Sequence, residues 1–201
     1  FPFTKSEVIK NLINFSQDEL HNYTSNRNFD YGPPHHNVSK ISPYIRRRFI
    51  SENEVLGVVL KDHKINNIEK FIEEIFWRTY WKGWLESHPW IYDEYKAYDE
   101  DQSIPKKTGI KCFEHWKEEL LDTGYLHNHS RMWFASIWIF TLGYSWQSGA
   151  NFFKNNLLDY CPASNTLGWR WVAGLQTIGK PYIAKADNIK YFTIKRFYPQ
   201  N

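Results

Sequence analysis

Residues 124–132 read GYLHNHSRM, and a second polar and aromatic stretch, ASNTLGWRW, follows at residues 163–171. Between them, residues 133–140 read WFASIWIF, an apolar run typical of a buried helix. Arg131 stands directly before this run, so its charge needs a partner, because an unpaired buried charge is strongly destabilising. Asp159 follows after a further helix-length segment and is the predicted partner.

Three tryptophans, Trp146, Trp169 and Trp171, frame the same part of the chain. Arginine, aspartate and asparagine side chains around one apolar centre are not what a plain hydrophobic core contains. Together with the tryptophans they predict a site for a large, flat ligand that has polar edges.

Four motifs carry a family resemblance. Residues 123–132 match the motif Thr-Gly-aromatic-x-His-Asn-x-x-Arg-Met. Residues 159–171 match, with one change, the motif Asp-x-Asp-x-x-x-Asn-x-x-Gly-Trp-x-Trp. Residues 39–44, SKISPY, resemble a Ser-Arg-Leu-Ser-Pro-Tyr loop, and residues 74–78, EIFWR, resemble a Glu-Leu-x-Trp-Arg helix. Their order and gaps match over residues 31–175. The chain therefore resembles the flavin-binding helical domain of the photolyase/cryptochrome family, without the antenna domain.

The predicted fold is all-α, because almost no strand pattern is visible. One domain is expected over residues 1–201, with core motifs at 31–175 and an irregular tail at 176–201. The predicted helices cover about the first 30 residues and residues 43–49, 66–87, 111–122, 127–143 and 148–158. A loop at 159–166, a short helix around Trp169 and a turn-rich tail complete the prediction.

By resemblance, the cofactor is FAD. Residues 39–42 are expected to hold its pyrophosphate, because hydroxyls and the N–H groups of a helix that Ser42 caps favour anions. The resemblance places Arg131 and Asp159 as a pair beside the isoalloxazine edge and Asn165 facing its N5. The cofactor-binding residues that it implies are Tyr31, Ser39, Lys40, Ile41, Ser42, Arg78, Asn128, Arg131, Asp159, Cys161 and Asn165.

The activity implied by the resemblance is light-driven DNA repair, in which an electron from reduced FAD splits a cyclobutane pyrimidine dimer. Glu74 would bond to the thymine carbonyls, and Trp77 and Trp171 would stack on a flipped dimer. The catalytic residues that the resemblance implies are Glu74, Trp77, Asn128, Met132, Trp146, Trp169 and Trp171.

Trp169 and Trp146 match the first two members of the family's electron-relay chain, and Ser103 falls at the position of the third. The relay is then either shorter or completed by another aromatic residue. The candidates for this replacement are Trp138, Tyr144 and Trp116.

A second function stays open: a cryptochrome-like blue-light photoreceptor, or a redox flavoprotein, that binds FAD and repairs nothing. Thr79 and Cys161 stand where the family has acidic residues, and both changes favour this alternative. Glu74, Trp77, Asn128, Met132 and Trp171 favour repair, because a sensor needs no lesion pocket. A scaffold that no longer binds FAD is a third alternative, and the complete flavin-side motifs argue against it.

The net charge of +3 is too small to indicate nucleic-acid binding by itself. Basic residues gather at residues 46–48 and again near the end of the chain, where they form either a solvated face or a phosphate-tracking surface. DNA containing pyrimidine dimers is the expected partner, with a separate antenna or signalling protein as a further alternative.

Membrane insertion and metal binding are not predicted. The apolar run at residues 132–142 is too short to cross a bilayer, so an intracellular, cytoplasmic location is expected. Cys112 and Cys161 form neither a disulfide framework nor a Cys-x-x-Cys site. His127 and His129 are two residues apart and face apart on a helix, with no second ligand pair after them.

Overall fold

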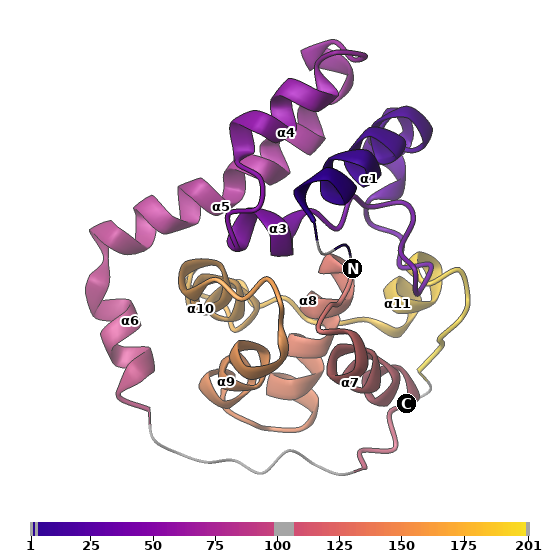
Figure 1. Ribbon diagram of the computed structural model, residues 1–201. Helices are drawn as coiled ribbons and strands as arrows, with labels where there is room; N and C mark the ends of the chain where they lie inside the picture. The colour runs from indigo at the N-terminus through magenta and orange to yellow at the C-terminus, as the bar shows by residue number, and fades with distance from the viewer. Residues whose placement is uncertain (1, 3, 99–106, 200–201) are drawn as a thin grey trace. The chain divides into compact units, whose positions relative to one another are not determined.

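The computed structural model describes residue 2, residues 4–98 and residues 107–199. These residues form helices and loops with no strand among them, which confirms the predicted all-α class (Figure 1). They divide into two compact units, residues 1–80 and residues 81–201, each described by itself below. The single domain expected over the whole chain stays a prediction.

The first unit is a small helical layer with its own hydrophobic core. Its elements are α1 (Lys5–Asp18), the 3-10 turn Leu20–Asn22, α2 (Tyr23–Asn26), α3 (Ser42–Arg46), α4 (Glu52–Val59), the 3-10 turn Ile65–Asn67 and the first part of α5 (Glu69–Ser87). Val8, Leu12 and Phe15 recur at helical spacing on α1 and are buried where α1 packs against α4. The packing of these two helices therefore forms the centre of the unit.

Capping boxes start both of these helices. The Thr4 hydroxyl accepts from the Glu7 backbone N–H and the Glu7 carboxylate accepts from the Thr4 N–H, and Ser51 and Glu54 repeat the arrangement at α4. Lys5, in the first turn of α1, also forms an ion pair with Glu54. The two capping boxes therefore determine where α1 and α4 begin, and the ion pair between Lys5 and Glu54 joins their N-terminal ends.

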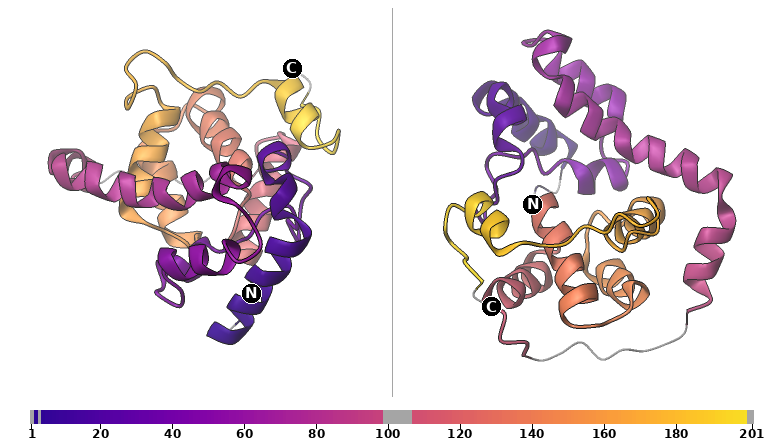
Figure 2. Two further views of the ribbon diagram at one scale, coloured as in Figure 1. Left: turned by 90° about the horizontal axis from the view of Figure 1, so that it is seen from above. Right: turned by 180° about the vertical axis from the view of Figure 1, so that it is seen from behind.

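The second unit packs its helices around aromatic side chains. Its elements are the last part of α5, α6 (Pro89–Lys96), α7 (Lys111–Thr123), α8 (Asn128–Ser136), the π-helical turn Ile137–Thr141, α9 (Trp146–Asn156), α10 (Pro162–Val172) and α11 (Ala186–Phe192). Helices α9 and α10 lie side by side (Figures 1 and 2). Trp116, Trp133 and Trp138 are fully buried in the core between the helices of this unit.

Gly124 ends α7 in the left-handed region, with φ +68°, and so turns the chain towards α8. A Cβ at this position would stand 2.6 Å from Cγ of Leu158, and the Leu158 N–H donates to the Gly124 carbonyl over 2.9 Å. Glycine is required here for its backbone angles and for the close approach of the segment after α9. This contact brings the residues around Asp159 to the start of α8.

Several helix boundaries differ from the sequence prediction. The loop expected at residues 159–166 is wrong, because α10 already begins at Pro162, where proline suits the first helical turn. Helix α4 was not predicted, and α11 lies in the tail expected to be turn-rich. The helix expected at 127–143 is α8 followed by the π-helical turn. The helix expected to continue to residue 49 ends at Arg46, and its N-cap is Ile41 rather than Ser42.

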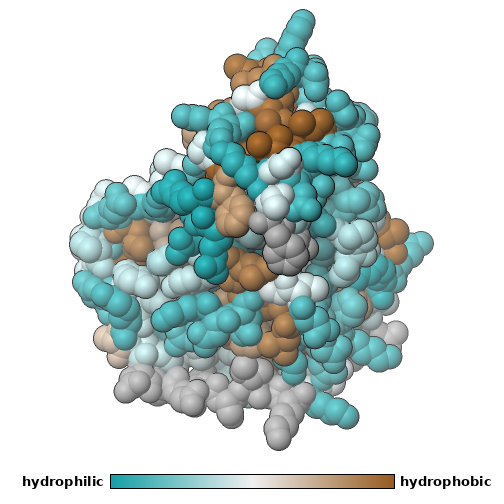
Figure 3. Space-filling view, viewed as in Figure 1, coloured by the Kyte–Doolittle hydropathy of each residue, from teal (hydrophilic) through white to brown (hydrophobic). Residues whose placement is uncertain are grey.

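The surface is mostly hydrophilic on the face shown in Figure 3, where hydrophobic side chains form small areas separated by polar ones. Within the described ranges, no helix is both long enough and apolar enough to cross a bilayer.

Glu54 makes the first unit sensitive to acid. Hydrogen bonds from Lys5 and from Ser51 lower the pKa of Glu54 from 4.5 to about 2. Because the folded-state pKa is depressed, the stability that this carboxylate contributes is present above pH 4.5 and is lost as the pH falls towards 2. We expect the Glu54→Gln variant to lose less stability than the native chain across that interval.

The measurement is urea unfolding followed by helical circular dichroism at a series of pH values. Glu52→Gln, in the same first turn, is the matched control. Equal acid sensitivity of the native chain and the Glu54→Gln variant would show that the Lys5–Glu54 contact contributes nothing.

Candidate functional site

Arg131 and Asp159 form the predicted ion pair, which is the strongest polar contact of the second unit. Nη1 of Arg131 donates to Oδ1 of Asp159 over 3.0 Å, and Nη2 donates to Oδ2 over 2.9 Å. Nε donates to the Leu126 carbonyl over 2.9 Å. The parallel pair of bonds is the fork geometry in which arginine binds carboxylates most strongly. It joins the first turn of α8 to the segment that leads into α10.

Arg131 keeps its positive charge. Burial acts to lower the pKa of Arg131, but the adjacent Asp159 carboxylate raises it by more, so the pKa lies above its ordinary value. Only 6% of the Asp159 side chain is exposed, against 22% for Arg131. Arginine has five N–H donors, and the protein takes up three of them in these contacts. The other two N–H groups make no hydrogen bond within the described residues.

Helix α10 brings further polar groups into the same unit. Asn165 is buried, and its amide nitrogen donates to the Ala150 carbonyl over 2.9 Å. Within the described part of the chain, the Thr166 hydroxyl and the Trp169 indole N–H are buried without a hydrogen-bond partner. Buried polar groups are normally paired, so two unpaired groups one turn apart indicate a site that a ligand completes.

The other predicted residues of this unit differ in exposure. Asn128 is exposed at the start of α8, and Met132, one turn on, is half-buried. Cys161 is buried and precedes α10. Trp171 is half-buried and stacks on Tyr182, with ring centres 5.5 Å apart. Sequence reasoning missed Tyr182, because it lies in the tail that was expected to be irregular.

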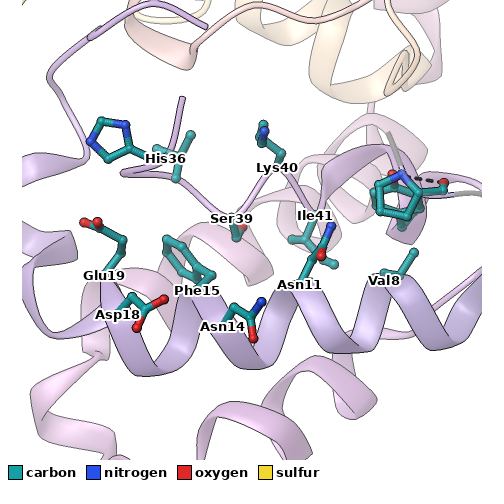
Figure 4. Close-up of a pocket in the computed structure, with 13 residues that line it drawn as sticks. Val8, Asn11, Asn14, Phe15, Asp18, Glu19, His36, Ser39, Lys40 and Ile41 are labelled. Carbon is teal, nitrogen blue, oxygen red and sulfur yellow. Dashed lines mark hydrogen bonds between the residues drawn. The ribbon is translucent and has the colours of Figure 1, made fainter. Parts of the chain in front are cut away.

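The predicted phosphate loop lies in the first unit, where Ser39, Lys40 and Ile41 line a hollow of about 450 Å³. Figure 4 shows α1 along the opposite wall, with Asn11, Asn14 and Asp18 turned towards the loop. Sequence reasoning missed these polar residues of α1, since nothing in a single amphipathic helix indicates which loop covers it.

Lys40 is held at the edge of this hollow. Its φ is +48°, and its ammonium group donates to the Pro34 carbonyl over 2.6 Å. Burial lowers the pKa of Lys40. Asn37 anchors the preceding turn, because its amide donates to the Asn26 and Phe29 carbonyls. Tyr31, on the same loop, stacks on His36 with ring centres 5.4 Å apart.

Glu74 lies on α5 and contacts Arg27, with Nε of Arg27 3.5 Å from its Oε1. Burial raises the pKa of Glu74, and the positive charge of Arg27 offsets part of this shift. Trp77, on the same helix, is 46% exposed and meets Tyr80 edge to face, with ring centres 5.4 Å apart. The Arg27 contact could not be read from the sequence, because no motif links positions 27 and 74.

The predicted site residues fall into two groups, one in each unit. Arg131, Asp159 and Asn165 belong to the second unit, with the relay residues Trp146 and Trp169. The predicted residues Tyr31, Ser39, Lys40, Ile41, Ser42, Glu74, Trp77 and Arg78 belong to the first unit. Ser103, at the third relay position, lies outside the described residues.

His127 has a structural role. Its Nδ1 accepts a hydrogen bond from the His129 backbone N–H over 3.2 Å and so caps α8. Among the described residues, no group of three or more histidines, cysteines or carboxylates is arranged to hold a metal ion.

The comparison with protein families decides what these motifs belong to. A family profile described as the FAD binding domain of DNA photolyase matches residues 71–197, which is more than half of the chain. The chain belongs to this family. The match includes the pair Arg131–Asp159 and all of α10, the elements that carry the buried polar groups described above.

Curated relatives are photolyases of greater length. A deoxyribodipyrimidine photo-lyase of Alkalihalophilus pseudofirmus is 29% identical in an alignment of 191 positions that covers 89% of this chain and 39% of the relative. That of Escherichia coli is 26% identical over 90% of this chain and 42% of its own length. The chain thus spans about two fifths of these relatives.

Solved structures share the fold. A class III photolyase from Agrobacterium tumefaciens matches with a TM-score of 0.69 and 24% identity, over 94% of this chain and 44% of that one. A cryptochrome from Synechocystis matches with a TM-score of 0.76 and 20% identity, over 96% of this chain and 44% of that one. The helical arrangement is therefore common to photolyases and cryptochromes.

The ion pair gives a stability prediction. Arg131→Ala leaves the Asp159 carboxylate buried without its partner, and we expect it to lose about 3–5 kcal/mol of unfolding free energy. Arg131→Lys keeps the charge but not the fork, so a smaller loss is expected. Urea unfolding monitored by tryptophan fluorescence measures both.

Lys96→Ala, which removes an ion pair between two exposed side chains of the same unit, is the control and should change little. An Arg131→Ala variant as stable as this control would mean that the buried pair does not hold α8 to the segment before α10.

Proposed function

We propose that this chain binds FAD and uses blue light to repair pyrimidine dimers in DNA. The observation that carries the proposal is the buried Arg131–Asp159 pair beside α10, where Thr166 and Trp169 leave buried polar atoms without partners in the described protein. Membership of the photolyase FAD-binding family supports it, as do relatives named deoxyribodipyrimidine photo-lyase.

The motifs imply FAD-binding positions in each unit, taken separately. In the second unit they are Asn128, Arg131, Asp159, Cys161 and Asn165, and in the first unit Tyr31, Ser39, Lys40, Ile41, Ser42 and Arg78. When bound in its reduced state, FAD supplies the electron that opens the dimer, and the protein supplies position and electrostatics.

Asn165 is suited to contact the polar edge of a flavin. Its amide nitrogen is bonded to the Ala150 carbonyl, so the amide oxygen is the group left to accept a hydrogen bond. Arg131 is suited to hold an anionic or carbonyl edge, because Asp159 and Leu126 orient its guanidinium and leave two N–H donors. Both side chains are fixed by the protein before a ligand binds, which lowers the entropic cost of binding.

Glu74 is suited to donate a hydrogen bond to a carbonyl of the damaged base. Burial raises the pKa of Glu74, and a carboxyl group that takes up a proton carries an O–H donor. Trp77 and Trp171 offer aromatic faces that are partly exposed, as stacking on an extruded base requires. Asn128 and Met132 complete the proposed lesion side from α8.

A photoreceptor that binds FAD without repairing DNA is the second candidate function. The buried Cys161, which stands where the family has an acidic residue, favours it because it changes the hydrogen bonding next to α10. Its partner would be a signalling protein.

The test is blue-light repair of a thymine-dimer oligonucleotide by the flavin-loaded, reduced chain, with a dark control. We expect light-dependent restoration of the thymines. A chain that holds and photoreduces its flavin but restores no thymine would overturn the repair function and favour the photoreceptor.

Variants of Glu74 test the lesion side in the same assay. Glu74→Ala should abolish most of the repair and leave the amount of bound FAD nearly unchanged, whereas Glu74→Gln should retain more repair because its amide still donates. The matched control is Glu73→Ala, on the adjacent position, where the native side chain pairs with Lys70. Equal repair by Glu74→Ala and Glu73→Ala would rule out the role given to Glu74.

A further inference from the structure

Helix α8 binds the segment that follows α10 through side chains on one of its faces. His129 and Ser136 are seven residues apart, a spacing that places both on the same face of a helix. Nε2 of His129 lies 3.3 Å from the Tyr182 hydroxyl, and the Ser136 hydroxyl accepts a hydrogen bond from the Ala184 N–H over 2.8 Å. Tyr182 therefore has a fixed place beside the first turn of α8, although it lies in the tail that was expected to be irregular.

The His129 ring is itself held by neighbouring rings. It stacks on Trp133, with ring centres 4.1 Å apart, and meets Phe192 of α11 at 4.8 Å. The indole N–H of Trp133 donates to Oδ1 of Asn188 over 2.9 Å, which joins α11 to α8. The Tyr182 hydroxyl is thus hydrogen-bonded to a ring that has little freedom to move.

The backbone brings Tyr182 back against the end of α10. Its N–H donates to the Val172 carbonyl over 3.0 Å. Between these two residues the chain turns at Gly174, whose φ is +75°, and a Cβ at this position would stand 2.9 Å from the nitrogen of Pro181. Glycine is therefore required here for the chain to return to Val172 and to its neighbour Trp171.

Tyr182 supplies the ring contact of Trp171. The two ring centres are 5.5 Å apart and the ring planes differ by 28°, and in the part of the chain that the structure describes Trp171 has no other ring contact. Burial raises the pKa of Tyr182, so the phenol stays neutral and keeps its hydrogen bond to His129. Trp171 is half-buried, so part of its indole remains accessible while Tyr182 restricts its rotation.

We propose that Tyr182 is a positioning residue of the lesion site, which holds the Trp171 indole in the orientation that stacks on an extruded pyrimidine dimer. The inference rests on the proposed function, because that function assigns Trp171 to the damaged base. Without the Tyr182 ring the indole can rotate, and binding of the dimer must then restrict it again. The cost falls on the affinity for damaged DNA and not on repair within the complex.

The experiment measures the Kd of the flavin-loaded chain for a thymine-dimer oligonucleotide and for the undamaged oligonucleotide, by fluorescence anisotropy in the dark. Tyr182→Leu removes the ring and should weaken binding of the dimer about fivefold, with no change for undamaged DNA. Tyr182→Phe keeps the ring and should bind nearly as tightly as the native chain. Tyr191→Leu, on the same tail, is the matched control, because Tyr191 is 64% exposed, and it should change neither Kd.

Two further measurements separate positioning from a general loss of structure. Repair in light at saturating dimer should be equal in the native chain and in Tyr182→Leu, since only the affinity changes. In the Trp171→Leu background, Tyr182→Leu should have no further effect on dimer binding, because the indole that it positions is absent. Bound FAD per chain verifies that each variant is folded, and Tyr182→Met, which retains more volume without a ring, replaces a leucine variant that does not hold FAD.

The inference and the proposed function fail in different ways. Dimer binding by Tyr182→Leu as tight as that of Tyr191→Leu, or a loss that persists in full in the Trp171→Leu background, would overturn the inference and leave the proposed function intact. A native chain that binds dimer and undamaged DNA equally, or that restores no thymine in light, would contradict the proposed function and the inference together.

Discussion

The second unit depends on one buried interaction, the forked ion pair between Arg131 and Asp159. An arginine next to an apolar helix is tolerated only if its charge is compensated and its N–H groups are hydrogen-bonded. Here the Asp159 carboxylate compensates the charge, and this carboxylate and the Leu126 carbonyl accept the hydrogen bonds. The pair fixes the start of α8 against the segment that leads into α10. Asn165, Thr166 and Trp169 take their positions from that segment, so the polar groups that a flavin would meet depend on the pair.

Aromatic packing supplies the rest of the framework. At most 1% of the surface of Trp116, Trp133 and Trp138 is exposed, and stacked contacts link Phe134 to Phe113 and to Phe152. A core built from large rigid rings has few ways to rearrange, because each ring fills a volume that no other residue type fits. The same rigidity keeps the rings at fixed separations.

The sequence predicted the parts of this structure that local chemistry determines. A charge beside an apolar run predicted the Arg131–Asp159 pair, and the structure confirms it. The start of α10 could also have been predicted, since Pro162 is a helix-start signal that was read as part of a loop. Helix α11 has one buried apolar residue, Ile189, so its sequence carries no periodic pattern to detect.

Contacts between distant segments could not be predicted in this way. Glu74 lies on α5 and Arg27 directly follows α2, and the two meet because these segments fold together. No motif contains both residues. The same limit applies to the ring contact of Trp169, which is with Trp138 and not with Trp146. This contact depends on Gly149 and on the π-helical turn. Motif matching assigns residues to positions, but the contacts of each side chain decide what it can do.

The most direct test of this account is titration of the purified, flavin-free chain with FAD, followed by quenching of flavin fluorescence and by thermal unfolding. We predict saturable binding of one FAD per chain and stabilisation of the fold by about 2.7 kcal/mol at a hundredfold excess over Kd. A well-folded chain that shows no saturable binding and no change in unfolding temperature would contradict the assignment of the buried pair and α10 to a flavin site.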